Sequence, residues 1–171
     1  MVVESDAVEI VARLMALSAR TAPPKARGGS DVIKTMIVTG REKEQLAGGA
    51  MREYGEKHDA GFFIRDAGGN VAASDACLLI GSLFADAVGL DCGGCGYATC
   101  AEMLDAQRGT TPRRPPPFRG GPNCIVRMAD LGIAVGSAAK TASIHNVDNR
   151  VMYTVGVGGR SRSGGWTAAG G

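Results

Sequence analysis

The chain has 171 residues, 44% hydrophobic and 21% charged, which fits a single globular domain that we expect over residues 1–157. Its formal net charge of +2 is too small to indicate nucleic-acid binding, and no basic helix or aromatic-interleaved patch accompanies it. We recognise neither a signal peptide nor a hydrophobic membrane span. We therefore expect a cytoplasmic protein whose cysteines remain reduced.

The first half of the chain predicts helices and strands in alternation. Apolar residues at helical spacing predict helices over residues 7–19 and 41–54. Runs rich in β-branched and apolar residues predict strands over residues 31–39 and 61–66, the second leading into a glycine-rich turn. Residues 75–89 are apolar nearly all round, which predicts a central helix. Together these elements indicate an α+β, or mixed α/β, fold with a small central sheet packed by apolar helices.

A basic loop follows the first helix. It contains Arg20, Thr21 and Lys25 among prolines and glycines. Arginine offers a bidentate fork and lysine a point charge, so this loop has the chemistry to hold a phosphate by charge-assisted hydrogen bonds. A solvated connector has the same composition, and the sequence leaves both interpretations open.

Four cysteines carry the clearest chemical pattern. Cys92, Cys95 and Cys100 have the spacing CxxCxxxxC, and Cys124 follows beyond a proline-rich loop. Three close thiolates and one distant thiolate can face the four corners of a cubane iron–sulfur cluster. The glycines between them allow the backbone to wrap closely around an inorganic core. We therefore predict a cluster-binding loop over residues 91–124.

Two other uses of these cysteines compete with the cluster. Four thiolates can hold a structural zinc ion, although zinc ribbons usually supply two CxxC knuckles and only one is present. Disulfides are the second alternative, and they require an oxidising compartment. The fifth cysteine, Cys77, lies in an apolar run, and we expect it to be a small buried hydrophobic residue.

The second half of the chain combines short regular elements. Residues 98–106 predict a short helix, and an apolar stripe predicts a longer helix that begins at Ile125 and stops at His145. A strand is expected over residues 149–156. Residues 158–171 have the composition of a flexible linker or a truncated end.

The segment between the third and fourth cysteines is rich in proline. Proline lacks an amide donor, so residues 110–122 are not expected to form regular structure. Arg113, Arg114 and Arg119 lie in this strap. They would either dock an acidic redox partner protein or only solubilise the loop.

Several motifs in combination resemble a known family. They are residues 19–23, Arg65-Asp66, residues 74–76 with 80–81, the CGxCGxxxC run, Cys124 with Arg127, residues 130–140 and residues 146–153. The combination resembles the uncharacterised ferredoxin domain-containing proteins of anaerobic bacteria and archaea. The resemblance implies a cluster bound by Cys92, Cys95, Cys100 and Cys124, without an assigned reaction. The cysteine loop is also similar to the [4Fe–4S] module of corrinoid iron–sulfur proteins and of Rnf B subunits, although the gap to the last cysteine is longer here.

The order of the elements resembles a second family, the FMN-dependent nitroreductases, in a trimmed form. In that family the loop after the first helix grips the flavin phosphate. The resemblance implies that Arg20, Thr21 and Lys25 lie near a phosphate and that Lys140 lies near the isoalloxazine ring. It also implies a homodimer, because flavin proteins of this type place FMN at a subunit interface.

Two hypotheses for function follow, and neither identifies a catalytic residue. The first is a [4Fe–4S] protein that transfers electrons, either alone as a carrier or beside a flavin in an oxidoreductase. The second is a zinc-stabilised structural or protein-interaction module. No paired carboxylates, serine–histidine arrangement or phosphate loop selects a substrate.

Overall fold

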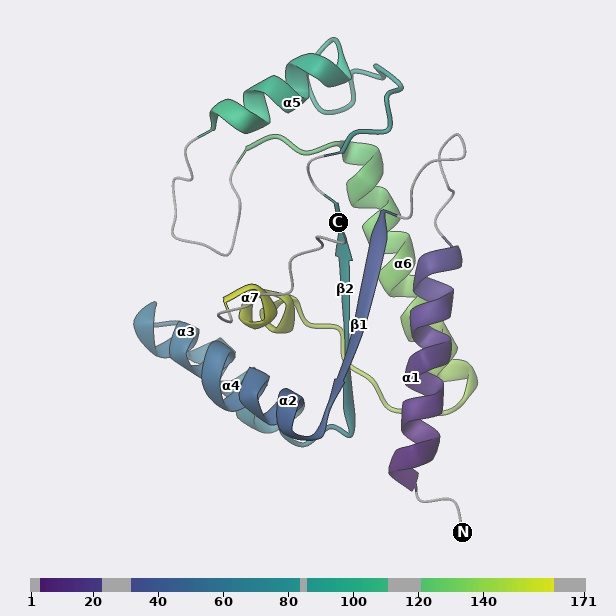
Figure 1. The fold of residues 1–171 in the computed structure, drawn as a ribbon, viewed down its shortest axis with the longest axis vertical. Coiled ribbons are helices and arrows are strands. Elements are labelled where there is room, and N and C mark those ends of the chain that lie inside the picture. The colour runs from purple at the N-terminus through teal and green to yellow at the C-terminus, as the bar shows by residue number, and fades with distance from the viewer. Residues whose placement is uncertain (1–3, 23–31, 84–85, 111–120, 162–171) are drawn as a thin grey trace.

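The computed structural model describes residues 4–22, 32–83, 86–110 and 121–161, with the side chains of residues 160 and 161 left out. It has two strands and a larger number of helices (Figure 1). In chain order the elements are α1 (Glu4–Thr21), β1 (Ile33–Thr39), α2 (Gly40–Gln45), the π-helix η2 (Leu46–Met51), α3 (Arg52–Lys57), α4 (Gly61–Asp66), the π-helix η3 (Ala67–Val71), β2 (Ala76–Ser82), α5 (Cys100–Gly109), α6 (Ile125–Ile144) and α7 (Tyr153–Ser161).

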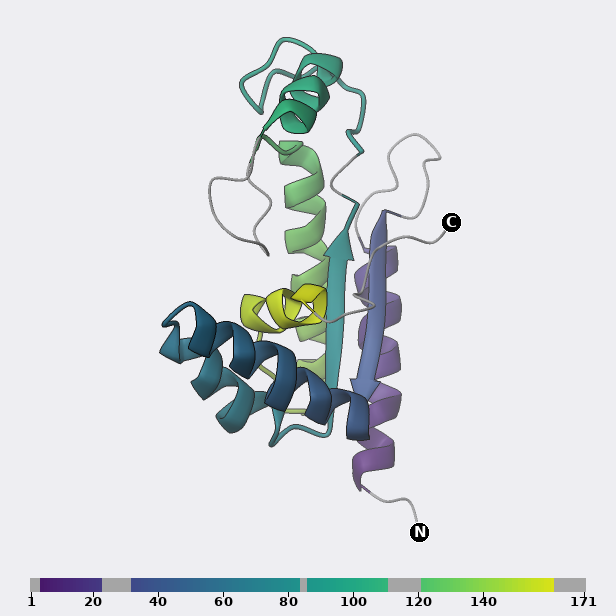
Figure 2. The same ribbon diagram turned by 60° about the vertical axis from the view of Figure 1, so that its left-hand side comes forward.

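The two strands form an antiparallel sheet with a helical layer on each face. β1 pairs with β2 from Ile33 opposite Ser82 to Thr39 opposite Ala76. In both ribbon views, α1 and α6 cover one face of this sheet, while α2, α3, α4 and α7 lie on the other (Figures 1 and 2). The α+β class and the small central sheet predicted from the sequence are confirmed.

Each face of the sheet has its own hydrophobic cluster. Between the sheet and the pair α1 and α6, the buried cluster consists of Ala19, Val32, Ile33, Ala134 and Ala138, with Met15, Leu78 and Ile80 packed against it. On the other face, Val38, Cys77 and Leu79 contact side chains of η2, η3 and α7. Alternate residues of β2 therefore contribute to two different clusters.

The prediction of a helix at residues 75–89 is wrong, because residues 76–82 form the strand β2. The physical reason is burial on both faces of the sheet. A strand with helices on both sides carries apolar residues at successive positions and loses the alternation that normally identifies a strand.

Two predicted strands are also wrong, because residues 61–66 form α4 and residues 153–161 form α7. Both helices pack closely on neighbouring helices at a glycine. A Cβ atom on Gly55 in α3 would lie 2.8 Å from Ile64 Cγ1 in α4, and one on Gly158 in α7 would lie 2.5 Å from Met51 Cγ in η2. These contacts between separate elements favour helix over the strand that local composition predicts.

The other predicted helices and strands agree with the structure, while the irregular segment predicted at residues 110–122 lies mostly outside the described residues. α1, β1, α5 and α6 occupy the positions predicted for them, and the helix predicted at 41–54 is present as α2, η2 and α3 in succession. α7 continues to Ser161, beyond the expected start of the tail at residue 158, while residues 162–171 lie outside the described residues. Among the described helices, none combines the length and the apolar character that crossing a membrane requires.

Gly158→Ala should destabilise the protein by about 1–3 kcal/mol, because the added methyl group would overlap the fully buried Met51 side chain. The measurement is the free energy of unfolding from urea denaturation. Gly156→Ala on the same helix is the matched control, since a Cβ atom there meets nothing within 4 Å. That substitution should be neutral or slightly stabilising. Equal losses in the two variants would contradict close packing of α7 on η2.

Candidate metal centre

The cysteine-bearing segment lies at one end of the molecule. β2 ends there, α6 begins there, and the loop before α5 crosses the same region (Figures 1 and 2). Cys92 is exposed, Cys95 and Cys100 are half-buried, and Cys124 is buried. All four have free thiols, as does Cys77. The structure thus brings the four predicted ligands to one end of the sheet.

Local backbone geometry explains how the loop bends. Asp91, Gly93 and Gly96 have positive φ angles of 48°, 69° and 86°, and the Gly96 amide donates to the Gly93 carbonyl at 2.9 Å. The two glycines adopt this conformation without the steric cost that a Cβ atom imposes. Asp91 Oδ1 accepts a hydrogen bond from the Cys100 amide at 2.6 Å. This bond connects the residue before the CxxCxxxxC run to the last residue of the run.

Contacts with the start of α6 join the loop to the fourth cysteine. A Cβ atom on Gly94 would lie 2.9 Å from Ile125 Cγ2 and 3.6 Å from Cys92 Sγ. Gly94 therefore allows the loop to approach the residue that follows Cys124. At the other end of α5, Gln107 Nε2 donates to the Pro122 carbonyl at 2.9 Å and lies 3.1 Å from Asn123 Oδ1.

Two of the thiols stand at helix N-termini. Cys100 is the first residue of α5, behind the N-cap Thr99, whose side chain accepts from the Glu102 amide at 3.2 Å. Cys124 is the N-cap residue of α6, and its side chain makes no capping hydrogen bond. The partial positive charge of a helix N-terminus favours a thiolate or another anion nearby. Both positions thus favour a negatively charged ligand group.

The arrangement fits the donor chemistry of an iron–sulfur cluster, which takes four cysteine thiolates. Within the described residues, no group of three or more His, Cys, Asp and Glu side chains is gathered closely enough to hold a single metal ion. The four thiols share one end of the molecule and the loop carries the glycines that a close backbone wrap requires. The residues present fit such a cluster by their type.

A buried ion network lies at the start of α6, and sequence reasoning assigned it no role. Arg127 Nη2 lies 3.2 Å from Asp86 Oδ2, and its Nη1 lies 3.6 Å from Asp130 Oδ2. Arg127 and Asp130 are only 5% and 2% exposed. The spacing of three residues from Cys124 to Arg127, and again to Asp130, was the available signal. It places all three on one helix face.

The basic residues predicted to bind a phosphate are only partly brought together. Arg20 and Thr21 line a groove of about 420 Å³ between α1 and β1, together with Arg13 and Thr35. Lys140 is exposed on α6 and is not among the described lining residues. Lys25 lies outside the described residues, as do Arg113, Arg114 and Arg119 of the proline-rich strap.

Cys77 is a core residue, as predicted. It is buried in β2, within the cluster that also contains Leu79. Burial raises the pKa of the Cys77 thiol, while a weak contact with the Ser74 hydroxyl at 3.9 Å and the charge of Lys43 offset part of that rise. A raised pKa keeps the thiol protonated, so Cys77 is unsuited to bind metal as a thiolate.

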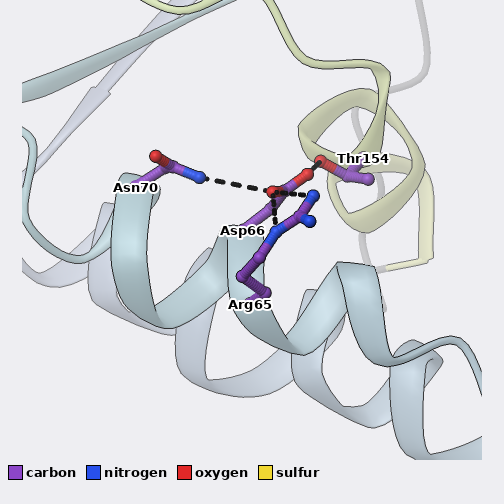
Figure 3. A network of polar contacts seen from close by, with 4 residues as sticks. All are labelled: Arg65, Asp66, Asn70 and Thr154. Carbon is purple, nitrogen blue, oxygen red and sulfur yellow. Dashed lines mark hydrogen bonds and ion pairs between the residues drawn. The ribbon is translucent and has the colours of Figure 1, made fainter.

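A second polar network, centred on Asp66, is structural. Asp66 is buried and accepts hydrogen bonds from Arg65 Nη2 at 3.1 Å, Asn70 Nδ2 at 3.2 Å and Thr154 Oγ1 at 3.0 Å (Figure 3). Both carboxylate oxygens therefore have donors. The network joins α4 and η3 to α7, at the face of the sheet opposite α1 and α6.

Sequence comparison places the chain in a family. Residues 120–164 match the family described as "Uncharacterized protein containing a ferredoxin domain". A protein of Archaeoglobus fulgidus, itself named "Uncharacterized protein", is 41% identical over 158 residues, which cover 90% of this chain and 78% of the relative. The chain belongs to this ferredoxin-domain family. No solved structure matches the ferredoxin-domain protein described here.

Thr154→Val should destabilise the ferredoxin-domain protein by about 1–3 kcal/mol, because it removes a buried donor to Asp66 while nearly preserving the shape of the side chain. Thermal and urea unfolding measure the effect. Arg65→Gln removes another donor to the same carboxylate, but the Arg65 side chain is 66% exposed, so we expect a loss below about 1 kcal/mol. A larger loss for Arg65→Gln would mean that the exposed contact, and not Thr154, holds Asp66.

Proposed function

We propose that this ferredoxin-domain protein binds one [4Fe–4S] cluster through Cys92, Cys95, Cys100 and Cys124 and transfers single electrons. The observation that supports the proposal is the contact of the cysteine loop with the start of α6, where Gly94 lies against both Cys92 and Ile125, the residue that follows Cys124. Membership of a ferredoxin-domain family supports an iron–sulfur role. Such a cluster, when bound by four thiolates, supplies one-electron chemistry.

The residues around the cysteines have separate tasks under this proposal. Asp91 holds the backbone of Cys100, and the helix N-termini at Cys100 and Cys124 stabilise negative charge. The buried Cys124 marks the side that excludes water, whereas the exposed Cys92 marks the side open to solvent. Outer contacts of this kind tune the potential of a metal centre.

A redox partner protein would dock at the solvent side. Leu90 and Ile125 are both exposed, and Gly94 brings Ile125 beside the cysteine loop. Apolar side chains around a cluster edge give a partner protein a contact surface within electron-transfer range. Free thiols and an oxygen-sensitive cofactor suit a reducing compartment, so we propose a cytoplasmic location.

Anaerobic reconstitution with iron and sulfide tests the cluster directly. We expect a brown protein with about four irons per chain, whose absorbance bleaches on reduction. Cys124→Ser should lose most of the iron and the visible absorbance. Cys77→Ala is the matched control, because Cys77 lies in the core, and this variant should retain a full cluster. A colourless protein with stoichiometric zinc would overturn the proposal and favour the structural module instead.

A second proposal is an FMN cofactor, which would make the protein a flavin-linked oxidoreductase. The groove between α1 and β1 favours it, because Arg13, Arg20, Thr21 and Thr35 line its wall together with the apolar Leu17 and Ile37. Cationic and hydroxyl groups suit a phosphate, and apolar walls suit a ring system. Ile10, Leu14 and Leu17 expose an apolar stripe on α1, which suits a homodimer beside that groove.

Titration of the purified protein with FMN, followed by flavin fluorescence, tests this second proposal. We expect binding in the micromolar range or tighter, and a loss of at least about tenfold in affinity for Arg13→Ala or Arg20→Ala, which removes a charged contact of roughly 1.4 kcal/mol or more. Lys140→Ala should alter the flavin spectrum if Lys140 approaches the ring. Arg52→Ala, on α3, is the control. Failure of wild type to bind FMN would reject the flavin without affecting the cluster.

A further inference from the structure

One donor of the buried Arg127 guanidinium has no acceptor. Its Nε–H is fully buried and makes no hydrogen bond within the described part of the chain. The two outer nitrogens are engaged by Asp86 and Asp130. A buried donor without a partner costs about 1–3 kcal/mol, and more when the group is charged. We therefore expect this Nε–H to gain an acceptor when the proposed cluster is bound.

The position of Arg127 indicates where that acceptor lies. Cys124 and Arg127 are three residues apart at the start of α6, and both are buried. Residues at this spacing share one face of a helix, and helical side chains lean toward the N-terminus. The Arg127 side chain thus extends toward the turn that begins at Cys124. Its partner Asp86 lies in the chain between β2 and the cysteine loop.

A second unpartnered atom lies near this end. Ser82 Oγ is the other buried side-chain atom without a hydrogen bond among the described residues, and Ser82 is the last residue of β2. β2 and α6 pack on each other through Leu78, Ile80, Ala134 and Ala138. Both unsatisfied atoms therefore belong to two elements that pack on each other. The core away from this end has no such atom within the described residues.

We propose that Arg127 belongs to the cluster site, where its Nε–H donates a hydrogen bond to a cluster sulfur. The inference rests on the cluster proposed above and assigns a residue outside the cysteine motif to it. A thiolate sulfur on a cluster accepts such a bond, and hydrogen bonds to the sulfurs raise the reduction potential. Asp86 and Asp130 orient the guanidinium so that Nε remains free for this contact.

The charges around the site predict the direction in which each substitution shifts the reduction potential. Reduction adds one negative charge to the cluster, so the cation of Arg127 favours the reduced state and a nearby carboxylate opposes it. Arg127→Gln should therefore lower the reduction potential. Asp86→Asn should raise it, although less, because the Asp86 side chain is 45% exposed and is partly screened by water.

Anaerobic redox titration of the reconstituted protein, monitored by electron paramagnetic resonance, measures these potentials. Arg108→Gln is the matched control, because Arg108 forms an i,i+3 ion pair with Asp105 as Arg127 does with Asp130, on the helix that begins at Cys100. Both members of that pair are exposed, with 67% and 72% of the side chain accessible. We expect the potential of this variant to stay close to that of wild type.

A spectroscopic measurement detects the hydrogen bond directly in wild-type protein. Wild-type protein is prepared with arginine labelled with ¹⁵N in the guanidinium group, and the reduced cluster is examined by pulsed electron paramagnetic resonance. We expect a ¹⁵N coupling in wild type that is absent from Arg127→Lys and retained in Arg108→Gln.

The outcomes separate this inference from the cluster proposal. A wild-type protein that assembles no cluster overturns both. A normal cluster without ¹⁵N coupling, or with equal potentials in wild type and Arg127→Gln, overturns the role of Arg127 and leaves it as a structural ion pair. Opposite shifts for Arg127→Gln and Asp86→Asn, together with the coupling, support it, because the shifts report nearby charge and the coupling reports the hydrogen bond itself.

Discussion

Burial of β2 on both faces is the constraint on which the rest of the structure depends. Leu78 and Ile80 face the layer of α1 and α6, whereas Cys77 and Leu79 face the layer that contains η2 and α7. A two-stranded sheet is marginal alone, so both helical layers are needed to remove its apolar surface from water. The strand so fixed ends at Ser82, ahead of the segment that carries the cysteines.

The cysteine loop depends on different interactions from the core. Its shape follows from backbone geometry at Gly93 and Gly96 and from the bond between Asp91 and the Cys100 amide. Its attachment to the body consists of the close contact of Gly94 with Ile125 and the polar contacts of Gln107. The Asp66 network lies on the face of the sheet opposite α1 and α6, and it holds α7 in place through Thr154. Folding of the core and shaping of the proposed cluster site are therefore separable.

Sequence patterns predict what local chemistry determines. The amphipathic stripe of α1, the β-branched run of β1 and the small-residue face of α6 each identify their element. The cysteine spacing is local too, so the order of residues alone is enough to recognise it. Local patterns do not identify β2, because burial on both faces removes its alternation. They do not identify α7 either, because Gly158 packs on Met51, more than a hundred residues earlier in the chain. Arg127 and Asp86 are 41 positions apart, and no local pattern predicts their pairing.

The ion network at the start of α6 explains why a charged arginine is buried in a protein of this size. Replacing a buried ion pair by apolar residues is often neutral or stabilising, so stability alone does not account for it. Asp130 neutralises the charge from within α6, and Asp86 fixes its direction from the chain that leads to the cysteines. With two nitrogens so engaged, Nε is left as the buried donor without a partner among the described residues. That geometry joins α6 to the segment between β2 and the cysteine loop through a single side chain, which suits the role that we propose for Arg127.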